Sequence, residues 1–313
     1  MIAITLGDPG GIGPEVVGKA LANQDLLALA RYRIFGPGCV APQLAAGIEF
    51  VDYPGMREDF PSKHARAGGE TSFRMVEDAI AAARLPIGDP GHVDAIVTGP
   101  ISKLAWQMAG RGEFPGHTEL FAARFGGSAG MMFVTPRLRV ILATAHVPLG
   151  RVPGLLTTDR VLRAIELGHE ACVRLGVSRP RIAVCGLNPH AGEAGLLGED
   201  ERRAIEPAIA AAAGRGMDVK GPFPGDTVFN AAVRGDFDLV VAMYHDQGLI
   251  PVKLLDRDRA VNVTVGLPVI RTSPDHGTAF DIAGKGIADP GSMKAAIELA
   301  IRMCATGPVR GAI

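Results

Sequence analysis

The sequence predicts a two-lobed α/β protein with a mostly parallel sheet and helices on both of its faces. The chain has 313 residues, which suits two α/β lobes better than one small domain. Hydrophobic residues make up 47% of it, which is ample for a core. Short β-type apolar runs alternate with longer helical patterns, and that alternation is typical of parallel sheets covered by helices.

The predicted strands are short runs rich in apolar and β-branched residues, bounded by polar or glycine-rich segments. Seven such runs recur along the chain: Ile2–Leu6, Tyr32–Phe35, Asp94–Val97, Leu138–Thr144, Arg181–Leu187, Leu239–Tyr244 and Ala260–Val265.

The predicted helices show apolar residues at steps of three and four. The clearest is Thr158–Leu175, where one apolar stripe is formed by Val161, Ile165, Gly168, Cys172 and Leu175. Two threonines before Asp159 suit its capping. Further helices are predicted at Glu199–Gly214, at Ser292–Thr306 and from Pro14 onward.

The chain has no internal repeat and no linker-like stretch. A two-lobed chain without a linker usually crosses between its lobes more than once, so we expect a discontinuous first domain. The expected division is a cofactor-side lobe of residues 1–115 plus 268–313 and a metal and dimerisation lobe of residues 116–267.

Charge and composition exclude several classes of partner. The formal net charge is −1 and the basic residues are scattered, which argues against nucleic-acid binding. No apolar run approaches the roughly 18 residues of a membrane helix. The first residues read as a strand rather than a signal peptide, and the cysteines form no CxxC pair, so we expect a cytoplasmic protein.

Gly7–Glu15 joins the first strand to a helix through a glycine-rich turn. Its spacing is not GxGxxG, so we reject an ordinary Rossmann dinucleotide site. Two interpretations stay open with equal weight, a tight strand-to-helix turn and a backbone that passes close to a ligand.

Three histidines follow predicted strands directly: His146, His190 and His245. Because the carboxyl ends of parallel strands meet at one edge of the sheet, these side chains can approach one another. Three imidazoles with an open fourth position suit Zn²⁺ or a similar divalent ion. A structural role for each histidine remains an equal alternative on these residues alone.

A second group follows His245, with Asp246, Lys253, Asn262 and Arg271 separated by gaps of seven, nine and nine residues. Lys253 and Arg271 interrupt otherwise apolar runs. A cation at an apolar strand end is better explained as a receptor for phosphate or carboxylate than as a solvated surface charge.

The segment 275–290 is a long loop dense in Gly, His and Asp. Such a loop can simply precede the final helix. Loops of this length and composition are more often functional, so we expect a binding role.

Five segments closely resemble the 4-hydroxythreonine-4-phosphate dehydrogenase family of pyridoxal phosphate biosynthesis. They are Gly7–Glu15, Val97–Lys103, Phe114–Glu119, Gly186–Glu193 and Tyr244–Gly248, and the resemblance runs from residue 2 to about residue 305. Separately, His276–Pro290 resembles the adenine-side loop of isopropylmalate and isocitrate dehydrogenases. The resemblance implies their two-lobed α/β/α fold, with the active site in the interlobe cleft.

The resemblance also implies roles for individual residues. His146, His190 and His245 match the family's metal ligands, and Asp226 matches an acidic residue that supports the site. The implied substrate contacts are His117, Thr118, Lys253, Asn262 and Arg271. The implied cofactor contacts are His276, Gly277, Thr278, Ala279 and Asp281. Asp246 and Lys253 are the candidate catalytic residues, with Asp246 as the suggested proton acceptor.

The implied activity is a metal-dependent, NAD- or NADP-linked oxidation of 4-phosphooxy-L-threonine. Its 2-amino-3-oxo product decarboxylates to 3-amino-2-oxopropyl phosphate. The metal would be Zn²⁺, with Co²⁺ or Mg²⁺ as alternatives, and the enzyme a homodimer with shared sites, in which His245 joins the partner's His146 and His190. Alternatives are a family relative that oxidises a tetronate 4-phosphate or a cis-dihydrodiol dicarboxylate, and, more remotely, a metal-dependent hydrolase without NAD.

Overall fold

The computed structural model describes residues 1–53, 60–127 and 129–307, and the chain forms two compact units. Unit 1 comprises Met1–Ala129 and Val261–Ile313, and unit 2 comprises Gly130–Ala260. The first unit is discontinuous in sequence. Its boundaries differ from the predicted ones, because residues 116–129 and 261–267 belong to unit 1. The strand at 261–265 is held there by antiparallel pairing with the strand at 270–274.

Unit 1 contains strands in the spatial order β3-β2-β1-β4-β11-β10. All neighbours are parallel except β10 and β11. The bounds are β1 Ile2–Thr5, β2 Tyr32–Phe35, β3 Glu49–Val51, β4 Ala95–Thr98, β10 Val261–Val265 and β11 Ile270–Pro274.

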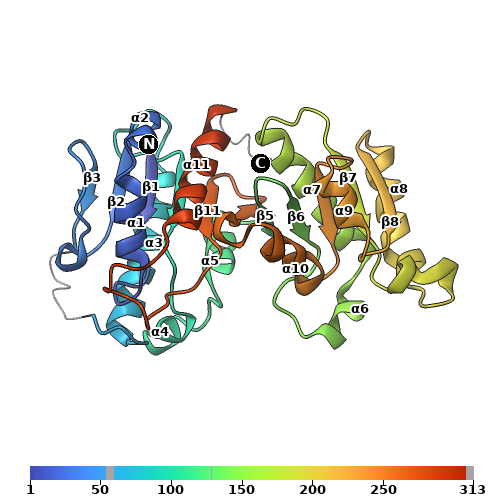
Figure 1. The fold of residues 1–313 in the computed structure, drawn as a ribbon, viewed down its shortest axis with the longest axis horizontal. Coiled ribbons are helices and arrows are strands. Elements are labelled where there is room, and N and C mark those ends of the chain that lie inside the picture. Colours follow the sequence, from blue (N-terminus) through green and yellow to red (C-terminus); the bar gives the residue numbers. More distant parts are fainter. Residues whose placement is uncertain (54–59, 128, 308–313) are drawn as a thin grey trace. The chain divides into compact units, whose positions relative to one another are not determined.

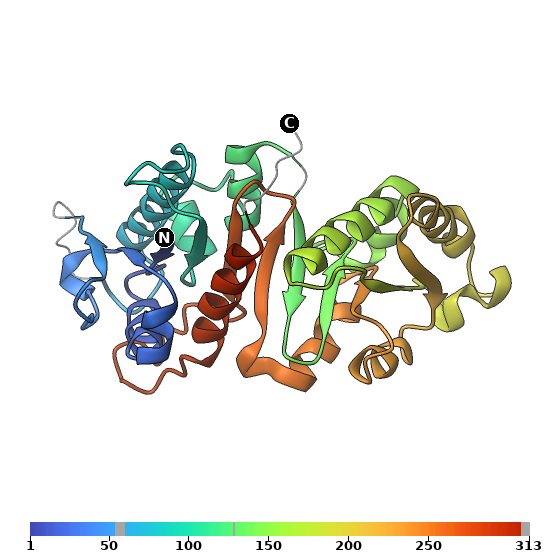
Figure 2. The same ribbon diagram turned by 90° about the horizontal axis from the view of Figure 1, so that it is seen from above.

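Helices cover both faces of the unit 1 strands (Figures 1 and 2). Helix α11 packs on β4, β10 and β11 and is joined by α1, whereas α3 packs on β1 and β4 from the other face. The bounds are α1 Gly13–Leu21, α2 Gln24–Leu29, η1 Gly38–Val40, α3 Arg66–Ala83, α4 Lys103–Met108, α5 His117–Phe125 and α11 Gly291–Ala305.

Unit 2 contains strands in the order β5-β6-β9-β7-β8, of which only β5 and β6 are antiparallel. The bounds are β5 Gly130–Val134, β6 Arg139–Leu142, β7 Arg181–Cys185, β8 Asp218–Phe223 and β9 Leu239–Ala242. Residues of β6 and β9 form the centre of a hydrophobic core with α9 and α10.

The unit 2 helices also lie on two faces, with α7 and α10 drawn on opposite sides of the strands in Figure 2. The bounds are η2 Leu149–Arg151, α6 Val152–Leu155, α7 Thr158–Arg174, η3 Pro189–Gly195, η4 Glu201–Ile205, α8 Glu206–Gly214, α9 Val228–Val233, α10 His245–Asp256 and η5 Arg257–Arg259. Every residue of the predicted α7 stripe is buried, and Thr157 caps the helix by accepting a hydrogen bond from the Arg160 amide. Among the described residues, no helix has the length and apolar character that crossing a membrane requires.

The α/β class, the seven predicted strands and the four predicted helices are confirmed. Sequence reasoning missed four strands: β3, β5, β8 and β11. Strand β3 is three residues long and half-buried, so it lacks an apolar run. Strand β11 contains Arg271, Thr272, Ser273 and Pro274, and this polar composition hides a strand that is buried throughout.

The glycines of the Gly7–Glu15 turn are accounted for by backbone packing. A Cβ on Gly13 would lie 1.8 Å from the Leu6 carbonyl oxygen, and one on Gly11 would lie 2.8 Å from the Thr278 carbonyl oxygen. Any side chain larger than hydrogen would therefore force the turn away from its neighbours. The tight-turn interpretation thus explains the motif.

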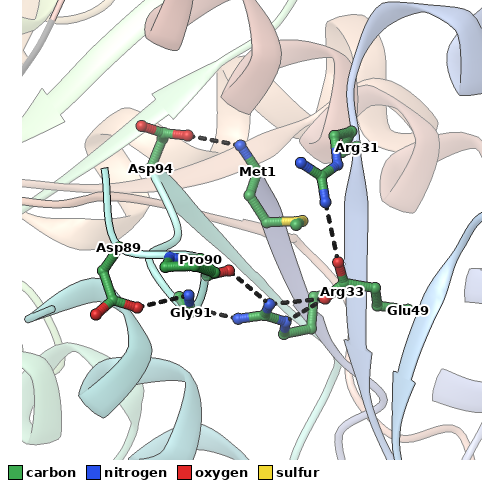
Figure 3. A network of polar contacts seen from close by, with 8 residues as sticks. All are labelled: Met1, Arg31, Arg33, Glu49, Asp89, Pro90, Gly91 and Asp94. Atoms are coloured by element: carbon green, nitrogen blue, oxygen red, sulfur yellow. Dashed lines mark hydrogen bonds and ion pairs between the residues drawn. The ribbon is translucent and has the colours of Figure 1, made fainter. Parts of the chain in front are cut away.

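A polar network fixes the amino ends of the unit 1 strands (Figure 3). The Met1 amino group lies 2.6 Å from Asp94 Oδ2. Arg33 donates to Glu49 Oε2 at 2.7 Å and to the Gly91 carbonyl at 2.6 Å. These contacts occupy the amino ends of the strands. In parallel α/β folds, ligands bind at the opposite, carboxyl ends.

Candidate functional site

Arg271 is a buried cation on β11, with an exposed fraction of 2%. Its Nη2 donates to Thr98 Oγ1 at 2.6 Å and its Nη1 donates to Thr264 Oγ1 at 3.0 Å. The guanidinium carbon lies 5.9 Å from the centre of the Phe121 ring. These neighbours orient the guanidinium without neutralising it.

The charge of Arg271 has no carboxylate partner within 4.0 Å among the described residues. Burial lowers its pKa to about 9, and Glu119 opposes this shift only in part. A buried cation without an anionic partner is costly unless a ligand neutralises it. The position therefore suits an anionic ligand.

Two unsatisfied polar atoms accompany Arg271. His117 Nε2 and Asn262 Oδ1 are enclosed and have no hydrogen-bond partner. Asn262 and Thr264 are two residues apart on β10, and Thr264 is paired with Arg271, so all three side chains lie on one face of the sheet. Buried polar groups are normally hydrogen-bonded, which points to a ligand as the missing partner.

His117 begins α5 and is held in its neutral form. Its pKa lies well below the usual value because burial disfavours the imidazolium and because Arg271 and Lys103 are nearby cations. The ring packs edge-on against Trp106, with centroids 5.5 Å apart. Thr118 follows on the same helix and is half-buried. We call Arg271, His117, Asn262, Thr98 and Thr264 the Arg271 cluster.

The candidate metal ligands lie in unit 2, where the structure brings two of the three together. The rings of His146 and His245 have centroids 5.6 Å apart. Two imidazoles on one tetrahedral metal, with metal–nitrogen bonds of about 2.1 Å, have centroids roughly 5 Å apart. His245 Nδ1 lies 2.7 Å from Asp246 Oδ1, which leaves Nε2 for a metal. The pair fits the chemistry of a shared divalent ion.

His190 does not join this pair. No group of three His, Cys, Asp or Glu side chains suited to a metal is found in the described ranges. His146, His245 and His190 follow β6, β9 and β7, and β9 lies between the other two strands and pairs with both. Strand order therefore separates His190 from His146 but does not by itself separate it from His245. The strand-end argument thus holds for one pair within a chain and not for all three histidines.

The turn that carries His190 has an unusual backbone. Residues 190–194 all have positive φ, including His190 at 53°, Ala191 at 53° and Glu193 at 42°. A left-handed helical conformation costs roughly 1–2 kcal/mol per non-glycine residue. His146 also has a positive φ of 47°. Strain at two candidate ligands is typical of functional sites.

The acidic and basic candidates of unit 2 are more exposed. Asp246 is 72% exposed at its side chain, and its Oδ1 lies 2.7 Å from His245 Nδ1. Lys253 lies on the same helix, α10, two turns further along, and is exposed. Asp226 is exposed in the turn between β8 and α9. Lys253 belongs to unit 2, whereas Asn262 and Arg271 belong to unit 1.

The candidate cofactor residues form one loop of unit 1. Thr278 is buried, and its carbonyl accepts a hydrogen bond from the Ile12 amide at 2.9 Å. His276 Nε2 is enclosed without a partner, and Ala279 has a φ of 42°. Gly277 and Asp281 are exposed. The hydrogen bond between Ile12 and Thr278 holds the middle of the loop, whereas Gly277 and Asp281 on either side of it are exposed to solvent.

Two side chains of α1 hold the end of this loop. Lys19 Nζ donates to the carbonyl oxygens of Gly286 at 2.9 Å and of Ala288 at 2.7 Å. Glu15 accepts from the amides of the same two residues at 3.2 and 2.8 Å, and it also pairs with Lys19 at 2.8 Å. The glycine-rich motif thus extends into a clamp on the loop.

Sequence reasoning missed four residues of these regions: Asp8, Lys103, Gln247 and Glu201. Asp8 is buried, with Oδ2 unpartnered, and burial raises its pKa to about 6. Gln247 accepts from the Met243 amide at 2.7 Å and donates to the Gly186 carbonyl at 2.8 Å, which ties the ends of β9 and β7 together. Asp8, Lys103 and Gln247 lie inside quoted motifs, so their presence there was an available signal. Glu201 had none, since it resembles a surface charge of a helix.

Comparison with known proteins identifies the family. Residues 35–300 match the family model described as pyridoxal phosphate biosynthetic protein PdxA. The chain belongs to this family. It is 46% identical to the D-threonate 4-phosphate dehydrogenase of Cupriavidus necator, over 96% of this chain and 98% of that protein. It is 44% identical to the 4-hydroxythreonine-4-phosphate dehydrogenase of Desulfosudis oleivorans, over 97% and 96% of the two chains.

A solved structure of the family shows the same fold. The crystal structure of the 4-hydroxythreonine-4-phosphate dehydrogenase of Klebsiella pneumoniae is 40% identical, with a TM-score of 0.84, and the match covers 97% of this chain and 99% of that one. The family resemblance and the fold class predicted from the sequence are therefore confirmed. These relatives also support assignment of the chain as a dehydrogenase.

Proposed function

We propose that this protein is a cytoplasmic, metal-dependent, NAD- or NADP-linked dehydrogenase of a phosphorylated four-carbon hydroxy acid. The first candidate substrate is 4-phosphooxy-L-threonine. Its oxidation gives a 2-amino-3-oxo acid, which loses CO₂ to form 3-amino-2-oxopropyl phosphate. The second candidate is D-threonate 4-phosphate, which is favoured by the 46% identity to the Cupriavidus enzyme of that name.

The Arg271 cluster is the observation that carries this proposal. A buried guanidinium with no carboxylate partner, next to the unsatisfied His117 Nε2 and Asn262 Oδ1, suits the phosphate of such a substrate. Arg271 would supply charge-assisted hydrogen bonds to phosphate oxygens. The neutral His117 and the amide of Asn262 would add uncharged hydrogen bonds. Binding energy from this remote group would position the reacting carbon.

The histidines of unit 2 would hold the reacting end. His146 and His245 would bind the metal together, with His190 as the third ligand. A bound divalent metal supplies Lewis-acid chemistry, and a bound nicotinamide accepts the hydride. Asp246 would fix the His245 ring through Nδ1 and so present Nε2 to the metal. Lys253, on the same helix, would serve as a substrate contact or as a catalytic group in place of Asp246.

The loop 276–281 would bind the cofactor, with the Glu15–Lys19 clamp holding its far end. A hydrolase has no use for such a loop, which weakens that alternative. The proposed assembly is a homodimer with shared active sites. Because His146 and His245 are neighbours within one chain, the ligand that the partner contributes would be His190 rather than His245.

The direct test is turnover of the purified protein with both phosphorylated acids and with each nicotinamide cofactor. We expect formation of reduced cofactor with at least one acid and loss of activity after chelation. The corresponding acids without phosphate should be poor substrates. Equal rates with and without phosphate would contradict the role of the Arg271 cluster, and turnover unaffected by metal removal would contradict the role of the histidines.

A further inference from the structure

Glu201 is a buried carboxylate that lies against the turn carrying His190. It begins the π-helical segment η4 and is 2% exposed. Nothing in its sequence position indicates burial, because its neighbours Asp200 and Arg202 are at least partly exposed. The burial of Glu201 is therefore a result of tertiary contacts.

The carboxylate accepts three hydrogen bonds, all from the two residues that precede Pro189 and His190. Oε1 accepts from the amides of Leu187 and Asn188, both at 2.8 Å, and Oε2 accepts from Asn188 Nδ2 at 3.0 Å. A Cβ on Gly192 would lie 2.6 Å from Oε2, so the far side of the turn also packs on the carboxylate. Glu201 thus contacts the turn on both sides of His190.

The charge of Glu201 has no cationic side chain within 4.0 Å among the described residues. Its neighbours are paired instead, Asp200 with Arg203 at 2.7 Å and Glu199 with Arg202 at 3.6 Å. Burying an unpaired carboxylate opposes folding, and the three N–H groups offset this only because they are held in place. A residue chosen for packing alone would be apolar here.

The contacts oppose the intrinsic preference of the turn. His190, Ala191, Glu193 and Ala194 adopt the left-handed conformation that non-glycine residues avoid. Such a backbone persists only where its surroundings determine it. The hydrogen bonds of Glu201 with Leu187 and Asn188 fix the backbone at the point where the chain enters the turn.

We propose that Glu201 is a positioning residue that holds His190 in the orientation needed to bind the metal. This inference rests on the proposed function, in which His190 is a ligand. Glu201 touches neither metal nor substrate and acts through the Leu187–Asn188 backbone. Residues that orient metal ligands commonly change metal affinity by roughly 10- to 100-fold when they are replaced.

The test compares Glu201→Gln with Glu199→Gln in the full-length protein. Glutamine keeps the volume and one acceptor for the two backbone amides, but its NH₂ group cannot accept from Asn188 Nδ2. Glu199 lies two residues away and is 65% exposed. The hydrogen bonds to Leu187 and Asn188 are made by Glu201 and not by Glu199. Glu199→Gln therefore controls for the loss of a negative charge in this segment. Co²⁺ alone is the probe, titrated into metal-free protein and followed by its visible absorption spectrum.

We expect Glu201→Gln to weaken Co²⁺ binding by roughly 10- to 100-fold and to alter the spectrum of bound Co²⁺. Amide exchange at 187–198 should accelerate, while the rest of unit 2 keeps its protection. Glu199→Gln should match wild type in all three measurements. A merely structural role would change exchange but leave the spectrum of bound Co²⁺ as in wild type.

Two further outcomes test the role of Glu201 and the assignment of His190 as a ligand separately. If Glu201→Gln binds Co²⁺ with wild-type affinity and spectrum, Glu201 does not position the ligand. His190→Ala, run in parallel, tests the ligand assignment itself. If that variant keeps wild-type Co²⁺ affinity, His190 is not a ligand, and the proposed metal site fails independently of Glu201.

Discussion

The Arg271 cluster of unit 1 and the histidines of unit 2 differ in how complete they are within one chain. Arg271 is buried, its guanidinium is fixed by two threonine hydroxyls, and unsatisfied atoms of His117 and Asn262 accompany it. In unit 2, His146 and His190 are exposed, their backbones are strained, and only His146 and His245 are neighbours. Among the described residues of one chain, the Arg271 cluster is assembled by folding, whereas only two of the three candidate metal ligands come together.

The two regions therefore differ in what each would need in order to function. The Arg271 cluster places a costly cation in the core, which under the proposed function the substrate phosphate would neutralise. The candidate histidines lie nearer to solvent, and under the proposed function a metal and a third ligand would order them. Variants in the first region should therefore change substrate affinity without loss of stability, and variants in the second should change metal content.

The largest effect is expected for Arg271→Met. Loss of charge-assisted hydrogen bonds to phosphate, worth about 1.5–3 kcal/mol, should lower kcat/KM roughly 10- to 100-fold. The free energy of unfolding should stay the same or rise, because a desolvated cation without a carboxylate partner is removed. Steady-state kinetics and urea unfolding measure the two quantities.

Arg33→Met is the matched control, since Arg33 pairs with Glu49 and donates to two carbonyls at the other edge of the sheet (Figure 3). It should lower stability and leave kcat/KM unchanged. The prediction is contradicted if Arg271→Met lowers the free energy of unfolding more than Arg33→Met does. It is also contradicted if the kcat/KM of Arg271→Met equals that of wild type.

A second prediction concerns Asp8, whose buried carboxyl has its pKa raised from 3.8 to about 6. The folded state holds the proton more tightly than the unfolded state, so this group's contribution is complete below pH 4 and is lost as the pH rises to about 6. The cost at neutral pH is on the order of 2–3 kcal/mol. Asp8→Asn removes the ionisation.

The difference in unfolding free energy between Asp8→Asn and wild type should therefore grow in favour of the variant from pH 4 to pH 7. A difference for Asp8→Asn that is independent of pH would mean that the buried carboxyl does not titrate in this range.

The smallest effect is expected for Lys19→Met, which removes two hydrogen bonds to the loop carbonyls of Gly286 and Ala288. Because the Lys19–Glu15 pair is partly exposed, the unfolding free energy should fall by less than about 1 kcal/mol. Amide exchange at 286–288 should nevertheless increase several-fold. Lys294→Met removes a comparable pair with Glu298 on α11 and should leave these amides unchanged; equal exchange in both variants would show that the clamp does not hold the loop.

The sequence predicted those parts of the fold in which local pattern and environment agree. Strand β2 and helix α7 were located almost to the residue because their apolar residues follow the period of the element. Strand β11 was missed because the polar side chains of Arg271 and Ser273 interrupt its apolar pattern, and the same interruption marked Arg271 as a candidate binding residue.

The sequence could not show what depends on tertiary contacts. Nothing local indicates that His190 and Ala191 adopt positive φ, and the contacts of Glu201 with the residues that precede this turn come from another segment of the chain. Asp8 and Glu201 read as ordinary polar residues until their burial is known. The candidate ligands were found by motif, but only the structure shows that, among the described residues, His146 and His245 form a close pair without a third ligand beside them.

The most direct test of the proposed metal site is subunit mixing between inactive variants. If His146 and His245 of one chain bind the metal together with His190 of the other chain in a homodimer, mixing His190→Ala with His245→Ala should restore about a quarter of wild-type activity. Half of the randomly formed dimers then contain one intact site of two. Mixing His146→Ala with His245→Ala should restore nothing, because each site loses one member of the pair. With subunit exchange confirmed independently, either recovery in the second mixture or no recovery in the first would contradict this arrangement.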